Sequence, residues 1–475
     1  MVSTFSRTLL VIVACLVVSL STTPTAASTP LRGLRDTHAA DPPLGHAGAL
    51  QYRLPATGGT TSRPLHLLQL SPRAAVSPSY LDGYSPKQIR GAYDIPANLT
   101  GAGITIAIVD AYHDPTAAAD FDAFSTQFGL PTIAGGCQCF RQVDQNGGRH
   151  YPPIDESGWR GETSLDIEWA HAIAPGATIL LVEAGSAPSG AGACSVDPSS
   201  LSDMLVAEDY ATAHAQVVSN SWGCLEFSSE GSLDAHFNKP VAIVFAAGDS
   251  GSPAYYPSAS PYVLSVGGTS LSIVGMAPSG GCTAGGCSWA GESVWVGGGG
   301  GASAYESEPA YQVGFCGTTA GVNACGGMRG TPDLSWMTGG SVGVAVYDSG
   351  APGPYRGWGS AGGTSVGAPS VAGLVALADQ AGHTVLTTND LTTRWAYQVA
   401  ASGSNYDSAY HDVTFGSNGV RCCSAAAGFD LASGLGSPVG ASWITLAAVA
   451  WCTIPSPNGP QGTSCWMRRR HMMSG

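Results

Sequence analysis

Residues 360–373 read SAGGTSVGAPSVAG and lead directly into the apolar run LVALA at 374–378. The pattern predicts a helix that glycines introduce and that carries Ser365 in its first turn. A serine hydroxyl is a weak nucleophile unless a general base lies within hydrogen-bond reach. If Ser365 performs chemistry, another part of the chain has to supply that base.

Upstream of this helix, short apolar runs alternate with segments of helical spacing. The apolar runs predict buried strands; they are ITIAIV (104–109), ATILLVEA (177–184), AQVVSNSW (215–222), VAIVFAAGD (241–249) and YVLSVGG (262–268). Residues 115–128, 161–173 and 201–215 have the spacing of helices. Such alternation is typical of a parallel sheet that helices cover on both faces. We therefore expect an α/β fold with a doubly wound parallel sheet, whose functional residues follow the carboxyl ends of the strands.

Two carboxylates occur in the second of these helices, in the motif GETSLD (161–166). Glu162 and Asp166 are four residues apart, so they share one face of the helix. Like charges at that spacing destabilise a helix by about 0.2–0.5 kcal/mol, and one pKa of a close carboxyl pair rises. A carboxylate tuned in this way can accept a serine proton in mildly acidic surroundings. The alternative interpretation is an ordinary acidic first turn that faces solvent.

A histidine would be the more familiar partner of a serine nucleophile. The chain order Asp110, His171, Ser365 would suit a histidine-dependent subtilisin, because Asp110 follows an apolar strand. No His-Gly-Thr segment follows Asp110, however, and His171 lies on the helix that carries GETSLD. We interpret His171 as a packing or surface residue and keep the histidine-dependent enzyme as a rival hypothesis. A further polar feature is AAGDSG (246–251), where an apolar strand delivers Asp249 into a tight turn.

Together, the motifs GETSLD, AAGDSG and GGTSVGAP resemble those of the sedolisins, or serine-carboxyl peptidases. The resemblance extends over residues 83–438, and the motifs occur in the order that the family has. It implies a subtilisin-like fold in which Ser365 is the nucleophile, Glu162 is its general base and Asp166 orients Glu162. It also implies that Asp249 lies in the oxyanion hole, where the aspartate must be protonated to stabilise negative charge.

The resemblance further implies one structural calcium ion near the C-terminus. The matching segments are YHDVT (410–414) and AAGFD (426–430), and an insertion-like run of residues 421–423 lies between them. Oxygen-only ligands in a flexible loop suit calcium. The implied ligands are the side chains of Asp412 and Asp430 and the carbonyl groups of Val413, Ala426 and Gly428.

The segment SNSWG (219–223) resembles the family's substrate-lining strand end. There, Ser221, Trp222 and Gly223 would pair with an extended peptide substrate through backbone hydrogen bonds. Trp222 fits a core position equally well. The glycine run 297–301 could border the same cleft or form a plain flexible loop.

The N-terminus has the features of a secretory signal peptide. The stretch MVSTFSR carries positive charge and precedes the apolar run LLVIVACLVVSL (9–20), so we predict a signal peptide at 1–27 and a secreted, extracellular protein. Residues 28–82 lack sustained periodicity and are interpreted as a short lead-in or remnant pro-segment, smaller than the family's usual pro-domain. We expect the peptidase domain at 83–450 and a disulfide-stapled tail at 451–475.

Cysteine usage fits an exported protein. Of 13 cysteines, Cys15 leaves with the signal peptide, and the even number that remains favours disulfides. The candidate bridges are Cys194/Cys224, Cys282/Cys287, Cys316/Cys325 and Cys452/Cys465. Zinc at Cys137 and Cys139 or at residues 422–423 is an alternative, but no histidine lies there at ligand spacing.

The composition of the chain argues against some classes of binding partner. The net charge is −14 and the only basic cluster is Arg468-Arg469-Arg470, so we expect no nucleic acid. No segment after the signal peptide has the uninterrupted apolar length that a membrane span needs. We predict a monomeric endopeptidase that is favoured by acidic pH and cleaves protein or peptide substrates through a serine acyl-enzyme. The alternative is a catalytically degenerate secreted protein that binds peptides on the same fold.

Overall fold

The computed structural model describes residues 67–69 and 83–450, except for residues 155–157, 188–193, 195–196, 278–280, 317–324, 340–341, 354–355 and 420–422. The expected signal peptide, nearly all of the lead-in segment and the C-terminal tail with Cys452 and Cys465 lie outside the described residues. Arg421 and Cys422, in the expected calcium region, also lie outside them.

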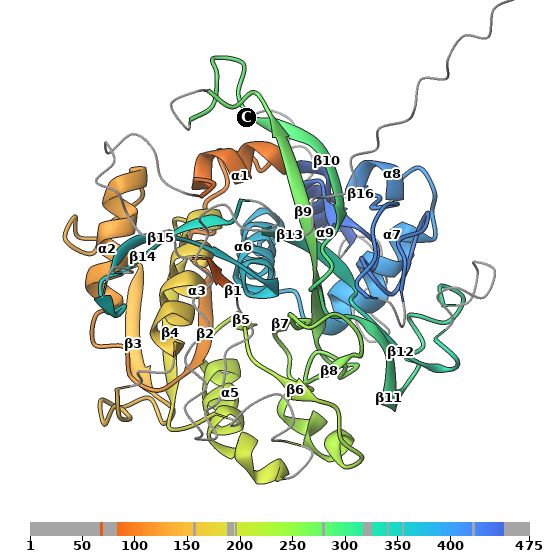
Figure 1. Ribbon diagram of the computed structural model, residues 1–475, viewed down its shortest axis with the longest axis horizontal. Helices are drawn as coiled ribbons and strands as arrows, with labels where there is room; N and C mark the ends of the chain where they lie inside the picture. Colours follow the sequence, from red (N-terminus) through yellow and green to blue (C-terminus); the bar gives the residue numbers. More distant parts are fainter. Residues whose placement is uncertain are drawn as a thin grey trace, which may run out of the picture. The chain divides into compact units, whose positions relative to one another are not determined.

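A central sheet with the strand order β10-β9-β7-β5-β2-β4-β3 carries the fold, and β13 also pairs with β9 (Figure 1). The strands are β2 (Thr105–Ala111), β3 (Phe140–Asp144), β4 (Thr178–Ala184), β5 (Val217–Asn220), β7 (Ala242–Ala246), β9 (Leu264–Val274), β10 (Ser288–Val294) and β13 (Leu334–Gly339). Their pairings are parallel except for the antiparallel hairpin of β9 and β10. The expected parallel sheet is therefore confirmed for its central strands, and the edge hairpin is an addition to it.

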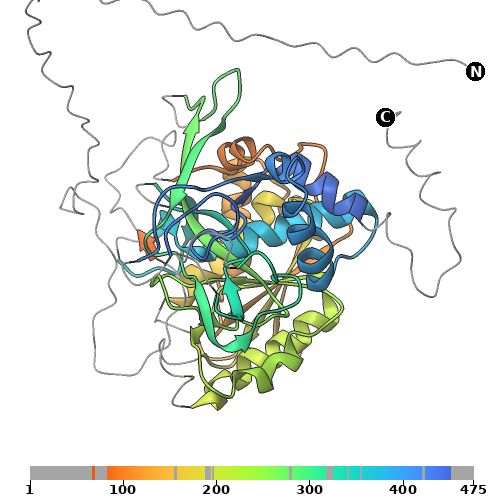
Figure 2. The same ribbon diagram turned by 90° about the vertical axis from the view of Figure 1, so that its right-hand side faces the viewer.

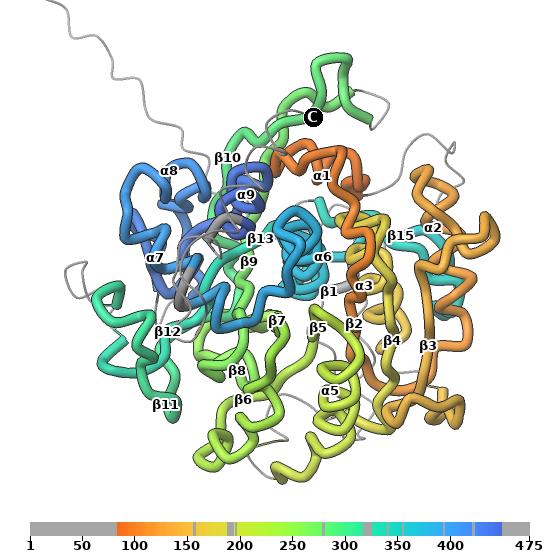
Figure 3. The backbone as a smooth tube through the Cα atoms, turned by 180° about the vertical axis from the view of Figure 1, so that it is seen from behind, coloured from red at the N-terminus to blue at the C-terminus, as the bar shows by residue number. Residues whose placement is uncertain are grey.

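Helices lie on both faces of this sheet (Figures 1 and 3). They are α1 (Pro86–Ala92), α2 (Ala117–Phe128), α3 (Trp159–Ile173), α5 (Ser202–His214), α6 (Thr364–Gly382) and α9 (Gly440–Ala450). Successive residues of β2 point to opposite faces. Ile106 and Ile108 join the apolar core under α3 and α6, whereas Ala107 and Val109 join a second core under α5. This division of one strand between two cores confirms the doubly wound arrangement.

Smaller elements complete the domain. A three-stranded antiparallel sheet has the order β1-β15-β14, and three two-stranded sheets pair β11 with β12, β6 with β8 and β16 with β17. Their bounds are β1 (Leu67–Gln69), β6 (Cys224–Leu225), β8 (Tyr255–Tyr256), β11 (Gly301–Ser307), β12 (Met328–Thr331), β14 (Val344–Asp348), β15 (Gly357–Gly362), β16 (Tyr410–His411) and β17 (Ser437–Pro438). The short helices are η1 (Pro198–Leu201), η2 (Glu230–His236), η4 (Asp390–Ala396), α7 (Tyr397–Ala400) and α8 (Tyr406–Ala409). Figure 2 shows the β9–β10 hairpin projecting beyond its neighbours.

Helix α3 is buried along almost its whole length. Only Arg160 among its residues is partly exposed, and Trp169 donates its indole N–H to the carbonyl oxygen of Ala345 at 3.0 Å. A helix buried on all sides usually carries apolar residues on every face. This one carries four titratable side chains instead, and buried polar groups of that kind are costly unless they have partners or a function. Helix α3 therefore marks the region of the candidate site.

Disulfide bonds join Cys194 to Cys224, Cys282 to Cys287 and Cys316 to Cys325, which confirms three of the expected pairs. Cys137 and Cys139 are bonded to each other. The alternative of zinc at these two cysteines is therefore wrong, because their sulfur atoms are already used. Among the helices in the described ranges, none combines the length and the apolar character that crossing a bilayer requires.

Candidate active site

Three buried carboxyl groups interact where the first turns of α3 lie near the end of β2. Glu162 and Asp166 of α3 and Asp110 of β2 are fully buried. Burial raises the pKa of Asp166 well above its usual range, Asp110 and Glu162 raise it further, and the nearby Ser221 hydroxyl lowers it. Asp166 is therefore a neutral acid at mildly acidic pH. The solvent-facing acidic turn, which was the alternative interpretation of GETSLD, is wrong because both side chains are inaccessible.

Asp110 belongs to this group rather than to a pair with a histidine. Burial and then Glu162 raise the pKa of Asp110 well above its usual range. The register of the parallel strands places Asp110 opposite Glu183 of β4, and Glu183 contacts His113 with 2.8 Å between its Oε2 and the ring Nδ1. Sequence reasoning placed Asp110, with Asp249 and the 219–223 loop, beyond the carboxyl ends of the strands, but it gave Asp110 a chemical role only in the rival hypothesis. That position at the carboxyl end of a parallel strand was the available signal, but it did not show that Asp110 interacts with Glu162.

The turn after β7 is joined directly to the start of α6. Asp249 Oδ1 accepts hydrogen bonds from the backbone N–H and the side-chain hydroxyl of Thr364, each at 2.8 Å. Gly248 donates its N–H to the same hydroxyl at 3.0 Å. Gly363 precedes the helix with a φ of 109°, which an L side chain rarely adopts. These contacts hold Asp249 against Thr364, the residue that precedes Ser365 in the chain. Ser365 is itself fully buried.

The glycine run 297–301 packs on this turn. The N–H of Gly299 donates to the carbonyl oxygen of Gly248 at 2.6 Å, and the N–H of Gly251 donates to the carbonyl oxygen of Gly297 at 2.8 Å. A Cβ atom at Gly299 would lie 1.9 Å from the carbonyl oxygen of Ala247, so only glycine permits this approach. The run is therefore held beside the turn that carries Asp249 by backbone hydrogen bonds and close packing, rather than forming a plain flexible loop.

The segment Ser221–Gly223 follows the end of β5. Ser221 is fully buried, and its hydroxyl lowers the pKa of Asp166. The indole ring of Trp222 packs edge-on against Phe245 with 5.0 Å between ring centroids, and Trp222 is 1% exposed. Its side chain is thus a core residue, and this segment can meet a ligand only through its backbone and through the partly exposed Gly223.

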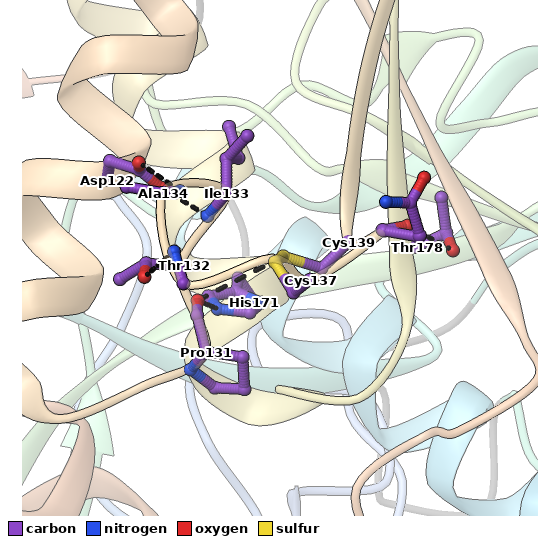
Figure 4. The surroundings of a disulfide bond; sticks show 11 residues. Asp122, Pro131, Thr132, Ile133, Ala134, Cys137, Cys139, His171 and Thr178 are labelled. Carbon is purple, nitrogen blue, oxygen red and sulfur yellow. Dashed lines mark hydrogen bonds between the residues drawn. A yellow bond between two sulfur atoms is a disulfide. The ribbon is translucent and has the colours of Figure 1, made fainter.

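His171 lies in the second half of α3, nine residues after Glu162. Its Nε2 is 3.0 Å from the carbonyl oxygen of Pro131, and its ring leans on Phe121 with 4.4 Å between centroids. Burial lowers its pKa to about 4. Figure 4 shows the ring beside Pro131 and the Cys137–Cys139 disulfide. These contacts support the packing interpretation and deprive the histidine-dependent rival of its base.

The segments expected to hold calcium come together. Asp430 accepts hydrogen bonds from the N–H groups of Ala426, Ala432 and Ser433, and Asp412 accepts one from the N–H of Gly428. Among the described residues, neither carboxylate forms an ion pair with a basic side chain. In those same ranges, no group of three or more His, Cys, Asp and Glu side chains could hold a metal. Asp412 and Asp430 alone supply too few oxygen ligands for calcium. They fit a calcium ion only if backbone carbonyl groups, which are among the expected ligands, supply further oxygen atoms.

Comparisons with known proteins agree with this geometry. The profile of the subtilase family, peptidase S8, matches residues 160–416, which include all of α3 except its first residue and all of α6. Kumamolisin of Bacillus sp. (strain MN-32) is 31% identical over 387 residues, which are 75% of this chain and 62% of the relative. Sedolisin of Pseudomonas sp. (strain 101) is 27% identical over 392 residues, which are 75% of this chain and 60% of the relative. The chain thus spans about three fifths of the length of these relatives.

One solved structure supports the fold in the same way. Pseudomonas sedolisin, complexed with two molecules of pseudo-iodotyrostatin, superimposes with a TM-score of 0.62 at 25% identity. The superposition covers 79% of this chain and 99% of the other. By its profile match, its sequence relatives and its fold, the chain belongs to the subtilase family and, within it, to the sedolisins.

Proposed function

We propose that this protein is a secreted serine-carboxyl endopeptidase that cleaves peptide bonds at acidic pH through an acyl-enzyme on Ser365. The observation that carries the proposal is the buried group of Glu162, Asp166 and Asp110, together with the attachment of Asp249 to the residue before Ser365. A fully buried serine nucleophile needs a buried base, and carboxylates on the neighbouring helix meet that need. Membership of the sedolisins supports the same assignment.

In the proposed reaction, Glu162 accepts the proton of the Ser365 hydroxyl while Oγ attacks the carbonyl carbon of the substrate. The oxyanion is stabilised by the N–H of Ser365 and by a proton on Asp249. Because Oδ1 of Asp249 is engaged with Thr364, Oδ2 would carry that proton. Collapse of the intermediate expels the amine, which takes the proton from Glu162. A water molecule then gives a proton to Glu162 while its oxygen attacks the acyl carbon. The ester bond to Ser365 breaks, the carboxylic acid product leaves, and Glu162 returns the proton to Ser365 Oγ.

The electrostatics of the group favour an acidic working range. The raised pKa values of Asp110 and Asp166 keep both carboxyls neutral in acid, so neither repels a negative charge on Glu162. Neutral Asp166 can also donate a hydrogen bond that orients Glu162. At higher pH Asp110 and Asp166 would ionise, and Asp166 would then lose the proton with which it can donate that hydrogen bond.

Substrate and calcium binding would follow the family pattern. An extended peptide would pair with the backbone of Ser221–Gly223, and the indole of Trp222 would hold that segment from the core side. Calcium would be bound by the side chains of Asp412 and Asp430 and by the carbonyl groups of Val413, Ala426 and Gly428. It would supply a positive charge that ties the 412–414 segment to the 426–430 loop.

The test compares three classes of variant in cleavage of a denatured protein substrate at pH 3–5. Ser365→Ala and Glu162→Gln should each lower kcat by several orders of magnitude, because each removes a reacting group. His171→Gln should retain most of the activity. A matched control is Glu168→Gln, since Glu168 is an equally buried acid of α3 that accepts a hydrogen bond from the N–H of Tyr347 at 3.0 Å.

Two outcomes would overturn the proposal. Equal losses for His171→Gln and Glu162→Gln would favour the histidine-dependent rival. Wild-type protein that binds peptides at pH 3–5, cleaves none of them and fails to react with a peptide aldehyde would indicate the catalytically degenerate alternative.

A further inference from the structure

A cavity of about 590 Å³ lies at the edge of the sheet opposite the candidate active site. Its walls include Lys239, which precedes β7, and Tyr262, which precedes β9, whereas Asp249 follows the other end of β7. β7 and β9 are parallel neighbours, so both of these walls lie at the amino ends of the strands. The five residues of β7 separate the cavity from the Asp249 turn by about 15 Å along the strand.

Glu306 of β11 brings an unpartnered carboxyl group to this cavity. The residue is only 8% exposed and belongs to the cavity lining. Its backbone N–H donates to Ser303 Oγ at 2.8 Å, but within the described ranges its carboxyl group takes part in no hydrogen bond or ion pair. A Cβ atom at Gly231 would lie 3.2 Å from Glu306 Oε1, so the carboxyl group rests against the backbone of η2. A buried polar group without a partner costs free energy, and a donor in the cavity would offset that cost.

Asp234 of η2 is a second acid in the same lining and is equally buried. Its Oδ1 accepts hydrogen bonds from the hydroxyl groups of Tyr256, at 3.2 Å, and of Ser260, at 2.7 Å. Its Oδ2 accepts none from the residues that the structure describes. The two hydroxyl groups therefore hold the side chain in place and leave one carboxyl oxygen for a further donor.

The remaining lining favours a positively charged ligand. Glu308 is a third acid of the lining, and Lys239 is the one basic side chain among its described residues. The Nζ atom of Lys239 lies 2.8 Å from Oδ1 of Asp209, which is outside the lining, so that charge is already balanced. Tyr262 and Tyr305 are 38% and 48% exposed, and we call this pair the tyrosine wall. Aromatic rings attract organic cations through the negative potential of their faces.

We propose that this cavity binds an organic cation, the guanidinium or ammonium group that ends an arginine or lysine side chain, with Asp234 and Glu306 as its anions and the tyrosine wall as its aromatic partner. A metal ion fits less well, because no group of His, Cys, Asp and Glu side chains in the described ranges could hold one. A cavity of about 300–1,000 Å³ is the usual size for a small ligand. The proposed binding does not depend on the proposed peptidase function.

The ionisation of Glu306 sets the conditions for this binding. Burial is the largest influence and raises the pKa of Glu306 to about 7; Asp234 and Glu226 raise it further, and Arg329 lowers it. Glu230 of η2 also interacts with Glu306 electrostatically. Glu306 is therefore a neutral acid at pH 5 and a carboxylate at pH 8. Because a neutral acid attracts a cation only weakly, we expect tighter binding at pH 8.

The first experiment measures binding by isothermal titration calorimetry at pH 5 and pH 8, with Ser365→Ala protein to prevent self-cleavage. One probe is butylguanidinium, a free organic cation. The other is the peptide Gly-Gly-Arg-Gly-Gly with both ends blocked. The control is the same peptide with citrulline in place of arginine, which keeps the shape of the side chain and removes its charge. Both cationic probes should bind more tightly at pH 8 than at pH 5, and the citrulline peptide should bind at neither pH.

The second experiment repeats the titrations at pH 8 with variants of the Ser365→Ala protein. Glu306→Gln and Asp234→Asn keep the size of each side chain and remove its charge, so each should weaken binding about tenfold to a hundredfold, the loss expected for a hydrogen bond to a charged group. Tyr305→Ala should weaken it about twofold to fivefold, the loss of an exposed cation–π contact. The matched control Glu168→Gln changes a fully buried acid of α3 outside the cavity and should leave the affinity unchanged.

The outcomes decide the proposal as follows. Binding of both cationic probes supports the site with a polypeptide side chain as the source of the cation, whereas binding of butylguanidinium alone supports it with a free small molecule as the source. Failure of both probes to bind at pH 8, equal binding of the arginine and citrulline peptides, or unchanged affinity in Glu306→Gln and Asp234→Asn would overturn it. If those two variants fail to fold, Tyr305→Ala and the citrulline comparison still decide. Absence of peptidase activity in wild type would refute the proposed function and leave this binding test valid.

Discussion

The C-terminal turn of α6 contains a carboxyl group that should make the fold more stable in acid than at neutral pH. Asp379 is 1% exposed, and its Oδ1 accepts the N–H of Leu386 at 2.9 Å. Its Oδ2 receives no hydrogen bond from the described residues. Burial raises the pKa of Asp379 to about 8, and Asp390 adds to the increase. Replacing Asp379 with asparagine removes this titration and keeps the acceptor for Leu386.

The magnitude follows from linkage between protonation and folding. The unfolded chain has a pKa near 3.8 at this position, so the folded form binds the proton more tightly. Each unit of difference between the folded and unfolded pKa is worth about 1.4 kcal/mol, which gives about 6 kcal/mol for the full difference. This stabilisation is fully present below about pH 4 and is lost progressively as the pH rises to about 8. Asp379→Asn should therefore lie within about 1 kcal/mol of wild type at pH 4 and exceed it by several kcal/mol at pH 8.

Urea unfolding at pH 4, 6 and 8 measures this difference, with Ser365→Ala in both proteins to prevent self-cleavage. The exposed Asp407 supplies the control, because Asp407→Asn should leave the pH dependence of unfolding unchanged. A constant free-energy difference between Asp379→Asn and its parent across the three pH values would refute the reasoning. It would mean that Asp379 is hydrated or paired in the folded protein.

Three further predictions follow from the site and the core. Asp249→Ala should lower kcat about 10²-fold to 10³-fold, the usual loss for one oxyanion donor. Asp249→Asn donates an N–H at every pH and should therefore retain a larger share of its activity at neutral pH than wild type does, so superimposable pH–rate profiles of Asp249→Asn and wild type would contradict this role. A calcium chelator should lower the melting temperature, since ligand at a hundredfold excess over its Kd stabilises the folded protein by about 2.7 kcal/mol. Asp430→Ala should remove the chelator's effect, and metal-free protein that melts identically with and without added calcium would rule out the site. Arg329→Met should destabilise the fold by about 3–5 kcal/mol in urea unfolding, because Arg329 and Asp333 form a fully buried ion pair of 2.6 Å; a loss below about 1 kcal/mol would show that Asp333 is neutralised in another way.

Local patterns predicted most of the central architecture. The apolar runs at 104–109, 177–184 and 241–249 became β2, β4 and β7, because a strand buried on both faces has to be apolar throughout. The helix at 161–173 became α3, and its four-residue spacing placed Glu162 and Asp166 together. Spacing made the disulfide pairs that are close in sequence candidates, since short loops bring such cysteines within reach, but the structure established their connectivity.

Other features depended on contacts between distant segments. The sequence 262–268 predicted a strand, but its extension to Val274 and the antiparallel partner β10 arise from pairing that spacing does not reveal. The orientation of His171 toward the carbonyl of Pro131 is similarly set by a loop 40 residues earlier. A histidine on a helix can face either solvent or core, and only the packed neighbours select between these environments.

The sequence alone determined which residue types could do chemistry, because a serine in a glycine-led helix, two carboxylates at helical spacing and an aspartate after a strand are local features. The tertiary structure decided that the carboxylates are inaccessible, that Asp110 joins them and that Asp249 is bound to Thr364. The physical reason is that burial and charge repulsion depend on every neighbour within a few ångströms. Those neighbours come from β2, α3, β7 and α6, which are separated by up to about 250 residues in the chain.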